Sequence, residues 1–77
     1  MEAKLKFSYD READILSIDR VKPYPEQETE ELKDDIVARF NPTNGEVENL
    51  EILFFSTRLL RENVFELPIL AIFKLAG

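Results

Sequence analysis

Alternating carboxylates occupy residues 10–14 of this 77-residue sequence, at Asp10, Glu12 and Asp14. Acidic side chains at every second position also open the EF-hand calcium loop, where they point at one cation. That loop requires glycine at its sixth position and a bidentate glutamate at its twelfth, and this chain has Ile15 and Val21 there. We therefore predict no metal site, and instead a hairpin turn in which the Asp10 side chain caps the following backbone amides.

A second acidic group follows further along the chain, at Glu28, Glu30, Glu31, Asp34 and Asp35. A carboxylate pair that performs acid–base hydrolysis needs one member in an apolar cleft, because desolvation raises the pKa of that member. Only Leu32 and Ile36 are apolar in this stretch. We therefore expect a solvated acidic surface here and not a hydrolytic site.

The sequence offers no side chain that would activate a nucleophile. It contains no histidine and no cysteine, so its serines and threonines lack the usual general base and thiol chemistry is excluded. Its two glycines are too few to build a loop that cradles phosphate groups. We predict a protein without catalytic residues, without a metal ion and without a cofactor.

Net charge restricts the expected partners. The chain carries 16 acidic and 10 basic residues, which gives −6 at pH 7. Such a chain repels phosphate backbones and anionic lipid head groups, so we expect a basic protein partner and neither nucleic acid nor a membrane surface. The sequence also lacks an apolar leader and any run of about 18 apolar residues. Together with the absence of cysteine, this predicts a cytoplasmic protein.

Period-two alternation predicts strands on both sides of the acidic turn. Leu5, Phe7 and Tyr9 alternate with polar residues, and the pattern resumes in residues 15–21, so these two runs should form a hairpin. Two prolines exclude a central strand from residues 22–26. The acidic residues 27–32 that follow predict either an edge strand or one helical turn.

The strongest local signal is the turn Pro42-Thr43-Asn44-Gly45, which predicts a hairpin between residues 36–41 and the apolar run that starts at Val47. Val47 and Leu50 are three positions apart, and we predict a β-bulge near residues 48–49 that brings both to the face of Ile52. The expected core of the sheet consists of Phe7, Leu16, Ile18, Phe40, Leu50, Ile52 and Phe54.

Residues 56–63 predict a helical turn with Ser56 as the N-cap, Leu59 and Leu60 facing inward, and Arg58 and Arg61 facing outward. We therefore expect one domain over residues 1–77, in which residues 57–77 add this turn and an apolar segment to the sheet. Its class is mainly β, at the border with α+β. It should be an antiparallel meander of five to six strands with one short helix after Phe55.

Residues 64–76 are apolar apart from Glu66 and Lys74. We favour a strand here over a helix that begins at Pro68, because β-branched and aromatic residues are frequent. A domain of this size has little interior left for such a strand, so the segment either completes the core or mediates a homodimer. The candidate interface residues are Ile69, Ala71, Phe73 and Leu75, together with Glu28 and Glu30 on the acidic edge.

The stretch from Tyr9 to Ile18 resembles the opening signature of a bacterial family known as domain of unknown function 2283. That signature is roughly Tyr-Asp-x-Glu-x-Asp-x-Leu-x-Ile after a short strand. Asn44-Gly45 and the following residues Val47, Leu50, Glu51, Ile52 and Leu53 resemble the family's closing hairpin. The chain departs from the family at Asp35, where a glycine often precedes the fourth strand.

This resemblance covers about residues 4–56 and implies a small cytoplasmic β-meander without established catalytic residues. Members of the family are sometimes encoded beside small toxin-like proteins, which implies an antitoxin-like binding role.

Three functions stay open on the sequence alone. The first is a non-catalytic protein-interaction module, with antitoxin-like binding of a basic partner as its specific form. The second is a small enzyme or ligand binder that uses loop carboxylates, and the third is an orphan structural domain. An interaction module should show a flat acidic or apolar face, whereas an enzyme should show a cleft with clustered carboxylates of perturbed pKa.

Overall fold

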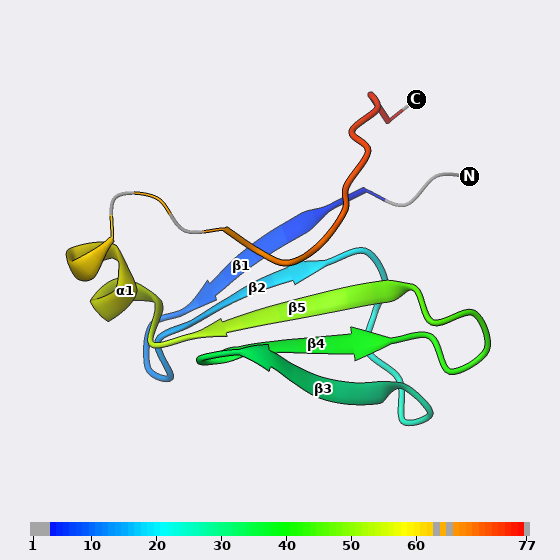
Figure 1. Ribbon diagram of the computed structural model, residues 1–77, viewed down its shortest axis with the longest axis horizontal. Coiled ribbons are helices and arrows are strands. Elements are labelled where there is room, and N and C mark those ends of the chain that lie inside the picture. Colours follow the sequence, from blue (N-terminus) through cyan, green and yellow to red (C-terminus); the bar gives the residue numbers. More distant parts are fainter. Residues whose placement is uncertain (1–3, 63, 65, 77) are drawn as a thin grey trace.

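The structure is a computed structural model that describes residues 4–62, 64 and 66–76, and it shows an antiparallel sheet with a short helix at one end (Figure 1). The elements are β1 (Lys6–Asp10), β2 (Ile15–Asp19), β3 (Glu28–Lys33), β4 (Ile36–Phe40), β5 (Val47–Leu53) and α1 (Phe55–Arg61). The mainly β class, the number of strands and the presence of one short helix are confirmed.

The strand order in the sheet is β1-β2-β5-β4-β3, so the predicted meander order is wrong. Residues 20–27 carry the chain from β2 to the far edge, and β5 then returns to pair with β2 (Figure 1). The physical reason is burial. Leu16 and Ile18 make β2 a more apolar neighbour for β5 than the acidic β3 would be, and β3 is left at the edge as predicted.

The hairpin between β4 and β5 has the local features that were predicted. Gly45 has a φ of +74° in the turn, a conformation that residues with a Cβ resist. The pairing register shifts at Glu48, which is the predicted bulge. The shift brings Val47 to the face of the sheet that carries Leu50 and Ile52.

The buried core is small, and its hydrophobic members are Ile36, Ala38, Leu50 and Ile52. Three further predicted core residues are partly buried and pack against it, namely Leu16, Ile18 and Phe40. Two predictions are wrong, because Phe7 is 64% exposed and Phe54 is 56% exposed. Phe7 lies on the edge strand β1, and Phe54 has a left-handed backbone at the junction between β5 and α1.

The predicted orientation of the helix is also wrong. Leu59 and Leu60 are exposed, whereas Arg58 is only 7% exposed. The Arg58 guanidinium donates to the backbone carbonyl of Asp34 and forms an ion pair with Glu62 at 3.6 Å. Burial of this arginine therefore depends on partners that the helical periodicity does not reveal.

The helix begins at Phe55 with Phe54 as its N-cap, so the prediction of Ser56 as N-cap is wrong too. Asn63, the last residue of the predicted helical turn, lies outside the described residues.

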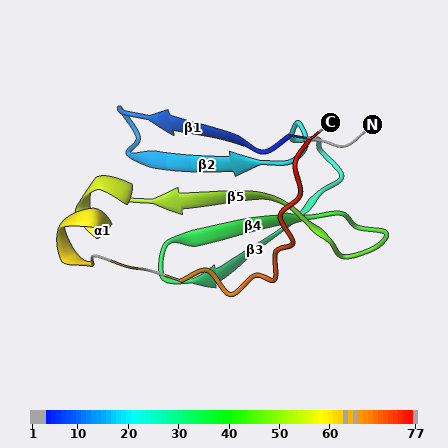
Figure 2. The ribbon, with the colours of Figure 1, turned by 90° about the horizontal axis from the view of Figure 1, so that it is seen from above.

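The described residues of the C-terminal segment, 64 and 66–76, form neither a strand nor a helix, so the strand prediction is wrong. Leu67 and Ile69 pack against the core, and the Ile69 amide donates to the Leu67 carbonyl at 2.7 Å across Pro68. This tight turn and the missing proline donor prevent regular pairing. Figures 1 and 2 show the segment crossing the sheet towards the N-terminal end of β1. Phe65 lies outside the described residues.

The pairing register separates an apolar face of the sheet from a polar face. Residues that lie directly opposite each other in antiparallel strands share a face. One row on the apolar face consists of Phe7, Ile18, Leu50, Ala38 and Glu30. The neighbouring row on the polar face consists of Ser8, Ser17, Glu51, Val37 and Glu31. At the β3 edge, an acidic residue is therefore the last member of a row on each face of the sheet, Glu30 on the apolar face and Glu31 on the polar face.

Candidate functional site

Asp14 connects the turn between β1 and β2 with the start of α1. Its carboxylate accepts hydrogen bonds from the Tyr9 hydroxyl at 2.5 Å, the Ser56 hydroxyl at 2.8 Å and the Ser56 amide at 3.0 Å. Its backbone carbonyl accepts from the Phe55 amide at 3.1 Å. Asp14 thus supplies the cap that the helix does not obtain from a side chain at its own N-cap, and its role is structural.

The acidic turn contains the cap that the sequence predicted. Asp10 Oδ1 accepts from the amides of Glu12 at 3.0 Å and Ala13 at 3.1 Å. In the described part of the chain, no group of three or more acidic side chains could hold a metal ion. That the whole protein binds no divalent metal stays a prediction.

The stability that Asp14 contributes should depend on pH. The Tyr9 hydrogen bond, followed by those from Ser56, holds the pKa of the Asp14 carboxyl below its ordinary value of 3.8. Because the folded pKa lies below the unfolded one, the contribution is present above pH ~4 and is lost as pH falls through the folded pKa. Asp14→Asn should therefore be less stable than the parent in urea at pH ~6.

The stability gap between this variant and the parent should narrow at pH ~2.5, because the charge of Asp14 contributes less to stability as pH falls below the unfolded pKa and towards the lowered folded pKa. Asparagine tolerates the positive φ of 58° at this position, so the comparison isolates the carboxylate. An equal gap at both pH values would contradict the proposed role of the charge.

Glu48 is the centre of a second polar cluster, which the sequence analysis missed. Its carboxylate accepts from the Tyr24 hydroxyl at 2.6 Å, from the Gln27 amide group at 3.1 Å and from the Asn41 amide group at 3.3 Å. Tyr24 and Gln27 come from the connection between β2 and β3, which the prolines had indicated only as a loop. The predicted bulge was the one sequence feature that could have indicated this cluster, because it takes Glu48 out of the regular hydrogen-bond ladder.

The ionisation of this cluster suits a structural role. The hydrogen bond from Tyr24 is the main cause that lowers the pKa of Glu48, and the same bond is the main cause that raises the pKa of Tyr24 to about 12. At neutral pH the carboxylate is therefore charged and the phenol keeps its proton. Neither group is poised to exchange a proton, so the cluster fixes the connection onto β5.

Asn49 holds the same connection from the polar face of β5. It is only 2% exposed, and its side-chain carbonyl accepts from the Gln27 amide group at 2.7 Å. Its own amide group donates to Asp19 at 2.8 Å and to the Val21 carbonyl at 2.7 Å. This buried amide therefore bonds to Asp19 at the end of β2 and to Val21 and Gln27 of the connection.

The acidic residues of β3 do not form a carboxylate pair. Glu28 and Glu30 lie opposite residues of the apolar face, whereas Glu31 lies on the polar face. All three are exposed, and none takes part in an ion pair with another described residue. These three carboxylates of β3 therefore form an exposed acidic edge.

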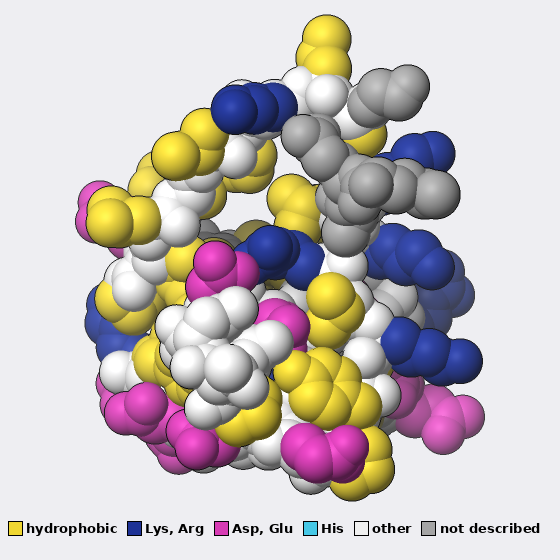
Figure 3. All heavy atoms as spheres, turned by 90° about the vertical axis from the view of Figure 1, so that its right-hand side faces the viewer, with side chains coloured by type: hydrophobic (Ala, Val, Ile, Leu, Met, Phe, Trp, Pro, Cys, Tyr) yellow, Lys and Arg dark blue, Asp and Glu magenta, His cyan; other side chains and the backbone are white. Residues whose placement is uncertain are grey.

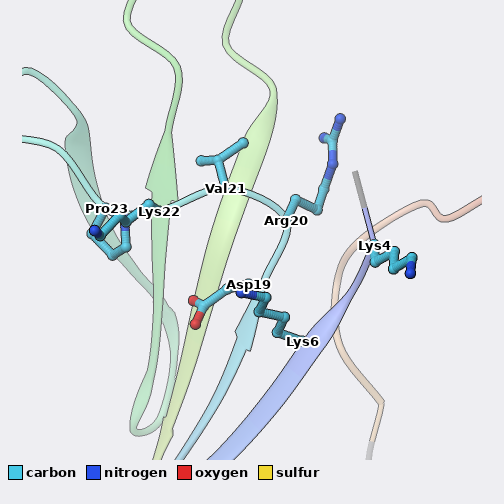
Figure 4. Close-up of a pocket in the computed structure, with 7 residues that line it drawn as sticks. All are labelled: Lys4, Lys6, Asp19, Arg20, Val21, Lys22 and Pro23. Carbon is cyan, nitrogen blue, oxygen red and sulfur yellow. The ribbon is translucent and has the colours of Figure 1, made fainter. Parts of the chain in front are cut away.

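Basic side chains gather at the opposite corner of the sheet, around a hollow of about 320 Å³ lined by Lys4, Lys6, Asp19, Arg20, Val21, Lys22 and Pro23. Figure 3 shows several Lys and Arg side chains along the right-hand side of this face of the molecule, with others elsewhere on it. In Figure 4, Arg20 and Lys4 extend in different directions. Arg20 already donates to the Val47 carbonyl at 3.0 Å. The hollow is therefore open, and its cations do not converge on one ligand position.

Two exposed apolar stretches lie on β1 and on the C-terminal segment, which crosses towards the N-terminal end of β1 (Figures 1 and 2). The first, the β1 strip, consists of Leu5, Phe7 and Tyr9, which are 44%, 64% and 43% exposed. The second, the C-terminal strip, consists of Leu70, Ile72, Phe73 and Leu75, all more than 80% exposed. Figure 3 shows hydrophobic side chains facing solvent on this side.

The predicted interface residues have different surroundings. Ala71, Phe73 and Leu75 are exposed, whereas Ile69 is half-buried against the core. Glu28 and Glu30 lie on the far edge of the sheet, on β3, and are not brought together with the C-terminal residues.

Comparison with known proteins identifies the family. A family model described as a protein of unknown function, DUF2283, matches residues 6–56, which is more than half of the chain. The chain belongs to the DUF2283 family. Neither the curated proteins nor the solved structures contain a match.

The matched part of the DUF2283 chain contains all five described strands and the first two residues of α1. Tyr9 and Asp14, which join the first hairpin to α1, belong to the stretch that resembles the family signature. The C-terminal strip lies outside the matched residues. Among the described residues of this DUF2283 protein, no helix has the length and apolar character to cross a membrane.

Proposed function

We propose that this DUF2283 protein is a non-catalytic protein-interaction module that binds through its exposed apolar surface. The observation that carries this proposal is the pair of uncovered strips, in which Phe7 is 64%, Phe73 is 81% and Leu75 is 98% exposed. Large apolar side chains exposed in this number often mark an interface, because burying them removes apolar area from water.

Two observations favour an interaction module over a small enzyme. The hollow beside Lys4, Lys6 and Arg20 is open, and its cations do not converge on one position. Among the described residues, the carboxyl groups with a shifted pKa are Asp14 and Glu48, and structural hydrogen bonds hold both in their charged form. An acid–base site needs a group whose pKa is moved towards neutrality.

The first candidate partner is a second copy of the chain. A chain of this size buries a small core, with four buried hydrophobic side chains among the described residues, and oligomerisation is a common way to add buried apolar area. In such a homodimer, Phe73 and Leu75 would be removed from water.

A basic protein is the second candidate partner, in the antitoxin-like form of the proposal. The observation that favours it is the acidic edge of β3, where Glu28, Glu30 and Glu31 are exposed and form no ion pair with another described residue. Their charge adds to the net charge of −6, which attracts cationic surfaces.

Sedimentation equilibrium tests the proposal. The parent chain should be a dimer at micromolar concentration, and the double variant Phe73→Ser with Leu75→Ser should weaken dimerisation at least tenfold, because two large apolar side chains no longer become buried. The matched control is Leu60→Ser on α1, where the leucine is 89% exposed. A variant that dimerises as tightly as the control would contradict an interface at the C-terminal strip.

A further inference from the structure

The geometry points to a homodimer in which β1 pairs with β1 of a second copy, antiparallel and centred on Ser8. This inference rests on the proposed function and names its partner. The strand β1 is at the end of the sheet and is hydrogen-bonded to β2 alone. All five of its residues are exposed, so its outer edge is accessible to another strand.

The sequence of β1 is complementary to itself in this register. Centring on Ser8 places Lys6 opposite the partner's Asp10 and Phe7 opposite the partner's Tyr9. The two-fold axis repeats each pair, so the dimer gains two ion pairs and two aromatic pairs.

The side chains that would meet already lie on matching faces. Phe7 is on the apolar face, in the row of Ile18 and Leu50, and so is Tyr9, in the row of Leu16. Lys6 and Asp10 are on the polar face. Edge pairing therefore joins two five-stranded sheets and continues the apolar face from one copy to the other.

The charged groups of β1 are accessible for this pairing. Asp10 uses Oδ1 to cap the amides of Glu12 and Ala13, which leaves Oδ2 for the partner's Lys6. Lys6 takes part in no ion pair with another described residue.

The other edge of the sheet disfavours the same kind of pairing. An antiparallel pair of β3 strands would bring Glu28, Glu30 and Glu31 of two copies together, and opposed like charges destabilise a strand pair. A bulge at Leu32 also interrupts the regular ladder of β3. The two edges thus have different properties, with β1 suited to self-pairing and β3 protected from it.

Other registers of β1 lose the complementarity within the strand. Centring the strand pair on Phe7 places Lys6 opposite the partner's Ser8. Centring it on Tyr9 places Asp10 opposite the partner's Ser8. Both alternative registers remove the Lys6–Asp10 ion pairs. Of these three registers, the one centred on Ser8 therefore has the most favourable charge pairing.

A single-cysteine experiment tests the pairing and its register, because the chain contains no cysteine. In the Ser8 register the two Ser8 Cα atoms lie about 4.5–5.5 Å apart, within the range that a disulfide spans. Ser8→Cys should therefore cross-link most chains under mild oxidation. Thr29→Cys, exposed on β3, is the matched control and should stay unlinked.

Phe7→Cys tests the alternative register. In the Ser8 register, Phe7 of one copy lies opposite Tyr9 of the other, so the two Phe7 residues are two positions apart along the strands. Their Cα atoms are then too far apart for a disulfide. Phe7→Cys should therefore cross-link far less than Ser8→Cys. More linkage at Phe7 than at Ser8 would overturn the Ser8 register.

A reversible measurement complements the cross-linking. Lys6→Gln removes both ion pairs of the dimer and should weaken dimerisation about 2- to 30-fold in sedimentation equilibrium. Lys22→Gln, the same charge change on an exposed lysine outside β1, should leave dimerisation unchanged. Equal dissociation constants for the Lys6→Gln and Lys22→Gln dimers would contradict the proposed ion pairs between Lys6 and the partner's Asp10.

The outcomes separate this inference from the proposed function. If Phe73→Ser with Leu75→Ser dissociates the parent dimer while Ser8→Cys links no more than Thr29→Cys, the interaction module stands and the β1 pairing is overturned. A parent chain that is a monomer at about 100 µM would overturn both the β1 pairing and the homodimer. Circular dichroism of each variant establishes that it is folded before its association is measured.

Discussion

Replacing Ile52 with alanine should lower the free energy of unfolding by about 2–5 kcal/mol. Ile52 is 1% exposed at the centre of the sheet, where it lies opposite Leu16 on β2 and Ile36 on β4. The truncation leaves a cavity that this small core has few side chains to fill. Domains of this size have a total stability of only about 4–12 kcal/mol, so the variant should lose a large share of it.

Urea denaturation followed by circular dichroism measures this loss for Ile52→Ala. The control is Leu60→Ala, because Leu60 is 89% exposed on α1 and its truncation should change stability by less than about 0.5 kcal/mol. A midpoint for Ile52→Ala equal to that of the control would show that the core lies elsewhere.

Replacing Asn49 with alanine should lower the free energy of unfolding by about 2–4 kcal/mol, the second largest effect expected. The variant leaves the Val21 carbonyl, the Asp19 carboxylate and the Gln27 amide group without the bonds that Asn49 provides. Groups that lose a partner while they stay away from water carry the full cost of desolvation. The connection between β2 and β3 should then detach from β5 more readily.

A double-mutant cycle with Gln27→Ala examines the mechanism of this loss. Because Gln27 donates to both Asn49 and Glu48, the two substitutions should be non-additive, with a coupling energy of about 0.5–3 kcal/mol. Thr29→Ala on the exposed edge should be additive with Asn49→Ala. Additivity of the Gln27 and Asn49 variants would mean that the amide bonds do not hold the connection.

Several elements of this protein follow from short stretches of its sequence. The turn at Gly45, the bulge at Glu48 and the cap by Asp10 all agree with the predictions. Each depends on residues within a few positions of one another, because positive φ, proline geometry and side-chain caps are local effects. The same holds for the period-two pattern that marks which residues share a face.

The candidate site was predictable only in part. Ala71, Phe73 and Leu75 were recognised by their apolar character, and the structure leaves them exposed. The β1 strip was instead assigned to the core through Phe7, because alternation shows which residues share a face but not whether anything covers that face. Whether other residues cover the apolar side chains of β1 depends on the position of β1 in the sheet.

Tertiary structure alone decided the order of the strands, and with it which surfaces are free. The placement of β5 beside β2 results from a competition between distant pairings, in which the apolar Leu16 and Ile18 are the better neighbours for Leu50 and Ile52. The course of residues 66–76 and the burial of Arg58 likewise depend on groups far away in the sequence, such as Asp34. Turns, the bulge and the two faces could be predicted because they need only residues close in the sequence. Edges and exposed strips exist only once all strands have taken their places.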